Sequence, residues 1–175
     1  MSMVQQNFVS EDDTPFSVLV VDDNEMNRDL LLRRLGSSGF QLASAENGKM
    51  ALDMMRCQSF DLILLDIMMP VMDGYETLEV MQKSAELKRV PVIMITALDD
   101  VDCAVRCIEM GAVDYVTKPF NPVLLKARVG ACLERKRLSD QEQRYRVSIE
   151  HSNKDLSDEV RAKIREISES QLAAI

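Results

Sequence analysis

Three aspartates stand where short apolar runs of the sequence end. Asp22 and Asp23 follow the run at 18–21, and Asp66 follows the run at 62–65. If these runs are neighbouring parallel strands, the three carboxylates meet at one edge of a sheet, where like charges repel unless a cation joins them. An all-oxygen site favours a hard ion, and Mg²⁺ fits because it keeps several waters and takes only one or two carboxylates. The spacing therefore predicts a magnesium site.

Two further polar residues lie at strand ends. Thr96 closes the run at 90–96, and Lys118 follows the run at 112–117, so a hydroxyl and an ammonium would face the carboxylates. A simpler interpretation is that Asp22 or Asp23 only caps the following helix, because Asp after a strand often does so. Four strand ends that each supply a polar group favour a shared site over separate caps.

The segments that must position these residues alternate between two kinds. Five short apolar runs are interleaved with longer segments whose apolar residues recur at three- and four-residue intervals, as in helices packed on a sheet. The apolar runs are 18–21, 40–45, 62–65, 90–96 and 112–117, and the helical segments are 27–35, 49–57, 75–86 and 100–110. This alternation predicts an α/β fold, a doubly wound parallel sheet of five strands with helices on both faces.

The C-terminal part of the chain differs from the rest in amino-acid composition. The last Pro is Pro122 and the last Gly is Gly130, and the following stretch is rich in Glu, Lys, Arg, Gln and Ala, which predicts one long helix. Apolar or small residues recur along it at roughly heptad intervals, as in a coiled coil. This predicted seam comprises Leu138, Tyr145, Ile149, Ser152, Leu156, Val160, Ile164, Ile167 and Leu172. Glu142 and Ser152 interrupt it, so an isolated charged helix remains the alternative.

Length, charge and cysteine content exclude several classes. The 175 residues suffice for one domain and a remainder, and the net charge of −8 lies entirely before residue 133. Without a basic stripe, nucleic acid is not the expected partner. No apolar run approaches the ~20 residues of a membrane span, and the first residues lack signal-peptide character, so we expect a cytoplasmic protein with no membrane partner. The four cysteines lack zinc-site spacing and are expected to be reduced thiols.

Over residues 16–133 the chain resembles the receiver domain of two-component response regulators. The segments that carry the resemblance are VLVVDDNEMNR, FDLILLDIMMPVMDGYE, VIMITA and DYVTKPF. The resemblance implies a flavodoxin-like sheet with strand order 2-1-3-4-5. A haloacid-dehalogenase-like phosphatase, which also uses an Asp nucleophile with Mg²⁺, is a disfavoured alternative, because that family needs a DxD arrangement after the first strand that Asp22-Asp23-Asn24 does not supply.

The resemblance also implies roles for individual residues. Asp66 matches the phosphoacceptor, and Mg²⁺ would be bound by Asp23, Asp66 and the backbone carbonyl of Met68, with Asp22 acting through water. Lys118 would neutralise charge on the transferring phosphoryl group.

A second pair matches the family's conformational switch. The Thr96 hydroxyl would move to bond a phosphoryl oxygen, and the Tyr115 ring would turn inward into the vacated space. The Lys118-Pro119 bond is a candidate cis peptide.

The expected organisation is a flexible N-terminus at 1–15, the receiver at 16–133 and a coiled-coil signalling helix at 134–175. The partners implied are a histidine kinase or phosphotransfer protein, a second copy of the chain through the helix, and an output domain in cis. The closing stretch KIREISESQLAAI resembles the lead-in to an HD-GYP cyclic-di-GMP phosphodiesterase. No output motif occurs in these residues, so a stand-alone phosphorelay or scaffold protein acting through its coiled coil stays open.

Overall fold

The computed structural model describes residues 14–97 and 101–172, with side chains as far as 165 except at 101. Residues 1–13 of the expected flexible N-terminus, and the seam side chains of Ile167 and Leu172, lie outside this description. The five strands are β1 (Ser17–Val21), β2 (Gln41–Ala45), β3 (Leu62–Asp66), β4 (Val92–Thr96) and β5 (Asp114–Thr117). All pairs are parallel and the order is β2-β1-β3-β4-β5, which confirms the predicted sheet.

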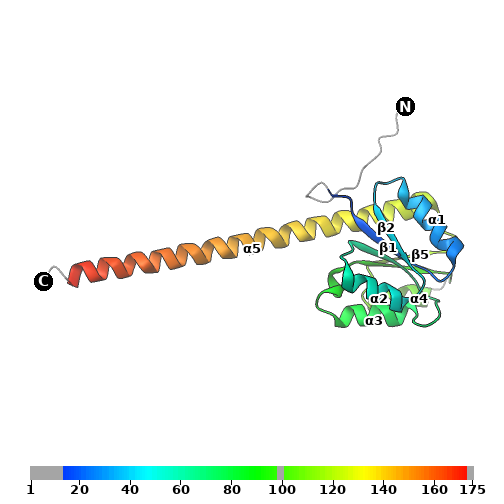
Figure 1. The fold of residues 1–175 in the computed structure, drawn as a ribbon, viewed down its shortest axis with the longest axis horizontal. Coiled ribbons are helices and arrows are strands. Elements are labelled where there is room, and N and C mark those ends of the chain that lie inside the picture. The colour runs from blue at the N-terminus through cyan, green and yellow to red at the C-terminus, as the bar shows by residue number, and fades with distance from the viewer. Residues whose placement is uncertain (1–13, 98–100, 173–175) are drawn as a thin grey trace, which may run out of the picture. The chain divides into compact units, whose positions relative to one another are not determined.

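Helices cover both faces of this sheet (Figure 1). They are α1 (Glu25–Gly36), α2 (Gly48–Cys57), α3 (Gly74–Lys83), α4 (Val101–Glu109) and α5 (Pro122–Leu172). Helices α2, α3 and α4 pack on one face, and α1 packs with the first turns of α5 on the other.

The central strands are apolar without alternation because each of their faces is covered. In β1, Leu19 and Val21 join the cluster under α2 to α4, whereas Val18 and Val20 join the cluster under α1 and α5. Every residue of β3 is buried. A strand buried on both faces reads as a continuous apolar run, which is why the sequence located these two strands well.

The third helix is shorter than its apolar periodicity indicates. It ends at Lys83 instead of continuing to residue 86, because Ser84 adopts extended backbone while its N–H still bonds to the carbonyl of Met81. The Ser84 hydroxyl then accepts the N–H of Leu87, at 3.3 Å, and a 3₁₀ turn at Leu87–Arg89 leads into β4.

The chain divides into two compact units, Met1–Arg137 and Leu138–Ile175. The first contains the sheet and its helices, and the second consists of the remainder of α5. Among the described residues, no helix is both long and apolar enough to cross a membrane.

Candidate functional site

The pairing of β1 with β3 brings the three predicted aspartates together. Val21 lies opposite Leu65, so the residues that follow these two strands are neighbours at the carboxyl edge of the sheet. One carboxylate oxygen from each of Asp22, Asp23 and Asp66 lies within 4.8 Å of the others. Asp22 is fully buried and Asp66 is 4% exposed, whereas Asp23 is exposed to solvent. The set is therefore two buried carboxylates and one that is open to solvent.

Lys118 reaches the two buried carboxylates from the end of β5. Its Nζ donates to Oδ2 of Asp22 at 2.7 Å and lies 3.0 Å from Oδ1 of Asp66. Its backbone N–H donates to the carbonyl of Thr96 at 2.7 Å, which ties the lysine to the end of β4. The following Lys118-Pro119 peptide bond is cis, as expected. The predicted placement of an ammonium opposite the carboxylates is thus what the structure shows.

Burial and charge shift the pKa values at this site. Burial, together with the charges of Asp22 and Asp23, raises the pKa of Asp66 above its ordinary value and outweighs the lowering effect of Lys118. Burial by itself lowers the pKa of Lys118, but hydrogen bonds to Asp22 and Asp66 more than offset it and raise that pKa. Lys118 is therefore firmly cationic, and the negative charge of Asp66 is only partly compensated by it.

The first turn of α1 holds the acidic pair in place. Asp22 accepts hydrogen bonds from the backbone N–H of Asn24 at 2.9 Å and from Nδ2 of Asn27 at 3.3 Å. Nη1 of Arg28 donates to the carbonyl of Asp22 at 2.9 Å and to that of Asp23 at 3.1 Å. These contacts fix both the side chain of Asp22 and the backbone of the pair.

Helix α1 is capped by Asn24, whose Oδ1 accepts the N–H of Asn27 at 3.2 Å. The interpretation of Asp22 or Asp23 as a mere helix cap is therefore wrong. Both carboxylates remain available to the site, because the cap is supplied by the next residue.

Thr96 and Tyr115 lie on neighbouring strands. Thr96 is buried at the end of β4 and pairs with Thr117, while Tyr115, two residues earlier on β5, is half-buried and pairs with Met94. Alternation along the strands places both side chains on the same face of the sheet. That face is the one covered by α2, α3 and α4, since Tyr115 packs against that cluster.

The loop after Asp66 is held close to the strand by Gly74. The Gly74 N–H donates to the carbonyl of Ile67 at 2.9 Å, and a Cβ at Gly74 would lie 2.3 Å from the carbonyl oxygen of Asp66. The Met68 side chain is 70% exposed, so this residue turns its side chain outward. Only a residue without a side chain allows the loop to pass this near to Asp66.

The donor set fits a hard divalent cation. All three side chains offer carboxylate oxygens, no sulfur or imidazole joins them among the described residues, and the exposed Asp23 leaves the cluster accessible to water. Mg²⁺ needs this combination of few protein oxygens and several waters.

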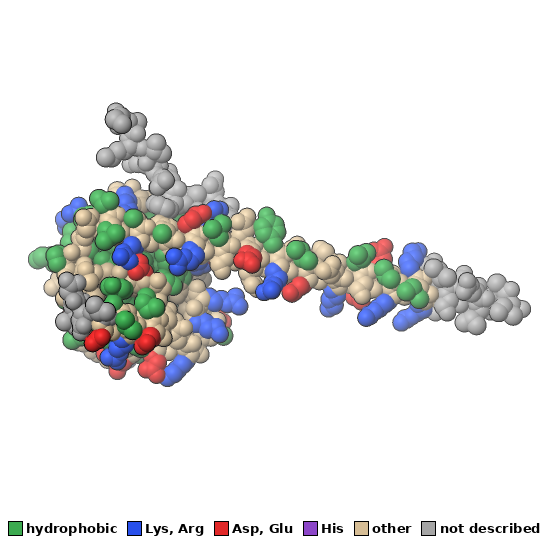
Figure 2. Space-filling model, turned by 180° about the vertical axis from the view of Figure 1, so that it is seen from behind, with side chains coloured by type: hydrophobic (Ala, Val, Ile, Leu, Met, Phe, Trp, Pro, Cys, Tyr) green, Lys and Arg blue, Asp and Glu red, His purple; other side chains and the backbone are tan. Residues whose placement is uncertain are grey.

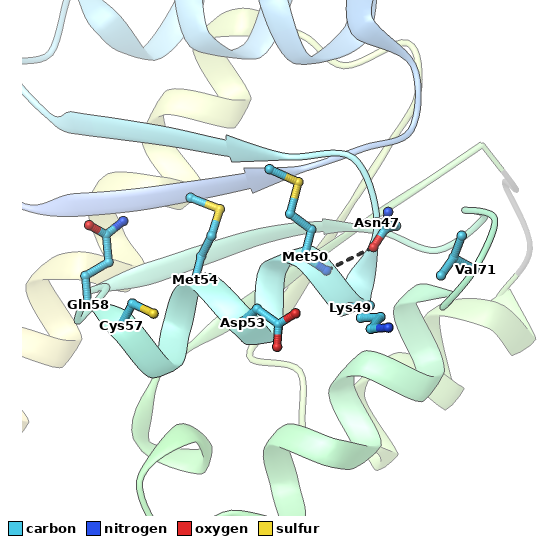
Figure 3. Close-up of a pocket in the computed structure, with 8 residues that line it drawn as sticks. All are labelled: Asn47, Lys49, Met50, Asp53, Met54, Cys57, Gln58 and Val71. Carbon is cyan, nitrogen blue, oxygen red and sulfur yellow. Dashed lines mark hydrogen bonds between the residues drawn. The ribbon is translucent and has the colours of Figure 1, made fainter.

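A separate hollow lies over α2 and takes no part in this cluster (Figure 3). It has a volume of about 610 Å³ and is lined by Asn47, Lys49, Met50, Asp53, Met54, Cys57, Gln58 and Val71. Asp22, Asp23, Asp66, Thr96 and Lys118 do not contribute to it.

The sequence interpretation missed several residues that support the site. Asn27 and Arg28 lie in the predicted helical segment at 27–35 without a role at the site, and Gly74 lies outside every predicted strand and helical segment. A sequence signal for Asn27 and Arg28 was present. Their helix begins directly after Asp22 and Asp23, so its first polar side chains must point back toward these two aspartates.

Comparisons with known proteins agree with this geometry. The family model described as "Response regulator receiver domain" matches residues 18–130. The Cyanidium caldarium protein named "Probable transcriptional regulator ycf27" is 43% identical over 118 residues, covering 67% of this chain and 46% of that protein. "Response regulator PleD" of Caulobacter vibrioides is 40% identical over 112 residues, covering 64% of this chain and 25% of that protein. The chain thus spans about half the length, or less, of these relatives.

Solved structures show the same fold. The receiver domain of the Francisella response regulator 1452 superposes with a TM-score of 0.64 at 32% identity, over 68% of this chain and 97% of that one. The chemotaxis response regulator CheY4 of Vibrio cholerae gives a TM-score of 0.64 at 29% identity, over 68% and 99%.

Proposed function

Because the chain belongs to the response regulator receiver family, we propose that Asp66 accepts a phosphoryl group from a histidine kinase or a phosphotransfer protein in a Mg²⁺-dependent reaction. The observation that carries the proposal is the buried carboxylate of Asp66, 3.0 Å from Nζ of Lys118 and within one cluster with Asp22 and Asp23. Receiver domains act in two-component signalling with such donors, so the class of partner follows from the family.

The reaction is a substitution at phosphorus. An oxygen of Asp66 attacks the phosphorus of a phosphohistidine, the P–N bond breaks, and an acyl phosphate forms on Asp66 while the donor nitrogen keeps the electron pair. The ammonium of Lys118, already within 3.0 Å of Asp66, offsets the charge that accumulates on the phosphoryl oxygens. The protein thus contributes position and charge more than covalent chemistry.

Asp23, Asp66 and the backbone carbonyl of Met68 would hold the Mg²⁺, with Asp22 acting through water. When bound, the ion would supply positive charge to carboxylates and phosphoryl oxygens alike. Asp22 already accepts from Lys118, Asn24 and Asn27, which suits it to an indirect role.

Thr96 and Tyr115 form the proposed switch. The Thr96 hydroxyl would bond a phosphoryl oxygen, and Tyr115 would then turn inward on the same face of the sheet. Such a change would alter the surface formed by α4, β5 and α5, which is the route by which phosphorylation at the sheet edge reaches a partner.

The test is phosphorylation by acetyl phosphate, followed by intact-protein mass spectrometry with and without Mg²⁺. We expect one phosphoryl group on the wild type and on Asp53→Asn, a matched exposed aspartate of α2 paired with Arg56. Asp66→Asn should remain unlabelled, and chelation of Mg²⁺ should abolish labelling of all forms. Labelling of Asp66→Asn to the wild-type extent would overturn the assignment.

We further propose that the C-terminal part of α5 forms a dimeric coiled coil. Hydrophobic and charged side chains alternate along it (Figure 2), and six residues of the predicted seam are at least half exposed in the single chain. These are Leu138, Tyr145, Ile149, Leu156, Val160 and Ile164. Such a stripe on a charged helix is stabilised when a second helix covers it.

Sedimentation equilibrium tests the dimer. Ile149→Asp places a charge on the seam and should shift the chain toward monomer, whereas Val147→Asp alters an equally exposed residue on the opposite side of the helix and should not. A wild type that is monomeric at all concentrations would remove the proposal.

The helix would carry the switch to an output domain, for which we propose a cyclic-di-GMP phosphodiesterase. The resemblance of the closing stretch to HD-GYP lead-ins supports this class of output. The greater length of the relatives supports a further domain without indicating its class. The alternative is a stand-alone phosphorelay or scaffold protein acting through the coiled coil.

The proposed location is the cytoplasm, consistent with four free cysteines.

A further inference from the structure

The thiol of Cys103 lies between two hydroxyl groups from different elements. Its Sγ is 3.1 Å from the phenolic oxygen of Tyr75, on α3, and 3.8 Å from Oγ1 of Thr96, at the end of β4. Both Thr96 and Cys103 are buried. Cys103 is on α4, so a single side chain connects this helix with α3 and with the proposed switch threonine.

In each of these contacts either atom could be the donor, and one pattern satisfies both contacts. Burial and the contact with Cys103 raise the pKa of the Tyr75 hydroxyl, which keeps its proton. When the phenol donates to sulfur, the single hydrogen of the thiol is left to be donated to Oγ1 of Thr96. The three groups can therefore form one chain that runs from Tyr75 through Cys103 to Thr96.

A second contact holds the tyrosine in place. The guanidinium carbon of Arg106, one helical turn after Cys103, lies 4.2 Å from the centre of the Tyr75 ring. Tyr75 is thus held to α4 at its ring by a cation–π contact and at its hydroxyl by the thiol. A displacement of Cys103 would therefore be transmitted to the contact between α3 and α4.

We propose that Cys103 is a positioning residue that stabilises Thr96 in its unphosphorylated arrangement and couples its movement to the contact between α3 and α4. The proposal rests on the proposed function, in which Thr96 turns toward a phosphoryl group on Asp66. That turn breaks the contact between Oγ1 and Sγ, so the thiol resists activation.

The test measures affinity for beryllofluoride in excess Mg²⁺ by calorimetry. Cys103→Ala and Tyr75→Phe each remove one link of the chain and should both bind the probe more tightly, by about two- to fivefold, the effect of losing one weak hydrogen bond. The control is Cys132→Ala, which truncates a buried thiol on the opposite face of the sheet and should bind as the wild type does. Urea unfolding of each variant separates a change in affinity from a loss of stability.

A second measurement uses the wild-type chain, so it does not depend on any variant folding. Site-resolved alkylation with iodoacetamide should modify Cys103 faster once beryllofluoride is bound, because its contact with Thr96 is then broken. Cys132, whose thiol has its pKa raised to about 11 by burial, should keep its slow rate.

Equal or weaker probe affinity in both Cys103→Ala and Tyr75→Phe would overturn the coupling. Failure of the proposed function looks different, because the wild type would then not bind beryllofluoride at all and Asp66 would not be labelled by acetyl phosphate.

Discussion

Nζ of Lys118 lies 3.0 Å from Oδ1 of Asp66 and 2.7 Å from Oδ2 of Asp22, so one ammonium serves two buried carboxylates. The lysine is itself mostly buried, with 19% of its side chain exposed, which limits screening by water. Under the proposed function, stability, metal binding and phosphorylation all depend on how this charge is shared.

Replacing Lys118 should abolish most of the phosphorylation activity. Lys118→Met keeps the volume and removes the charge, and we expect the rate with acetyl phosphate to fall by about 10²- to 10³-fold, the usual cost of losing one electrostatic contact to a transition state. Lys126→Met, at a half-buried lysine of α5 whose Nζ is bonded to Ser37, is the matched control and should react at the wild-type rate. A Lys118→Met variant that reacts normally would show that the ammonium has no part in transfer.

The raised pKa of Asp66 predicts a specific pH dependence of stability. A carboxyl whose pKa is higher in the folded state binds its proton more tightly there, so its favourable contribution is complete below the ordinary value of 3.8 and is lost as pH rises through the folded pKa. In Mg²⁺-free buffer at pH 7, Asp66→Asn should therefore be more stable than the wild type, and the difference should vanish near pH 3. Urea unfolding across this range measures it. Added Mg²⁺ should stabilise the wild type more than the variant, and a variant less stable at pH 7 without Mg²⁺ would contradict the interpretation.

Arg28 should influence metal affinity without touching the metal. Its contacts with the carbonyls of Asp22 and Asp23 orient the acidic pair, and loss of such supporting contacts typically weakens metal binding about 10- to 100-fold. Calorimetric titration of Arg28→Ala with Mg²⁺ should show a loss in this range. Arg33→Ala removes an arginine of the same helix that forms an exposed pair with Asp29, at 3.8 Å, and should bind Mg²⁺ normally.

Two glycines should respond in opposite ways to the same substitution. In Gly74→Ala the new Cβ would meet the backbone of Asp66 and Ile67, so we expect a loss of about 2–3 kcal/mol in the free energy of unfolding, with much slower phosphorylation. Gly36→Ala, at the end of α1 with no atom within 4 Å of the new Cβ, should be neutral or stabilising by up to about 1 kcal/mol. Equal changes in the free energy of unfolding at the two positions would mean that the loop after Asp66 moves at little cost to accommodate the new Cβ.

Val71 has a backbone conformation that suits it poorly. Its φ is 72°, in the left-handed region, where a β-branched residue is strained, and its side chain is 79% exposed at the rim of the hollow over α2 (Figure 3). Val71→Asn should raise the free energy of unfolding by about 1 kcal/mol, because Asn tolerates this region. Val71→Ala keeps the Cβ and should gain less. Urea unfolding of each variant measures this free energy. A Val71→Asn variant that is less stable than the wild type would imply that the Val71 side chain packs against another group in solution.

The sequence predicted the sheet because burial on both faces leaves a plain signature. The runs containing Leu19 and Leu64 are apolar throughout, and the aspartates directly after them could only lie at the carboxyl edge. The meeting of Asp22 with Asp66 then required only that the two strands be neighbours, an order that the resemblance to receiver domains implied.

Other features depended on packing that no local pattern records. The contact of Cys103 with Tyr75 joins residues 28 positions apart on two helices, and the sequence does not reveal how those helices face each other. The end of α3 depended on the backbone conformation of Ser84, although the apolar periodicity continues beyond it. Valine disfavours the left-handed region, so the residue type at position 71 gave no reason to predict the conformation of Val71.

The contact between Lys118 and Asp22 spans 96 positions of the chain. It also joins the first strand to the last one, and β5 forms an edge of the sheet. During synthesis, a nascent chain that has not yet reached residue 118 holds its acidic pair and Asp66 without their resident counter-charge. Contacts of such long sequence separation slow folding, because the entropy of loop closure is lost before the contact forms. Under the proposed function, a chain whose β5 has not yet joined the sheet would lack the ammonium that phosphorylation of Asp66 requires.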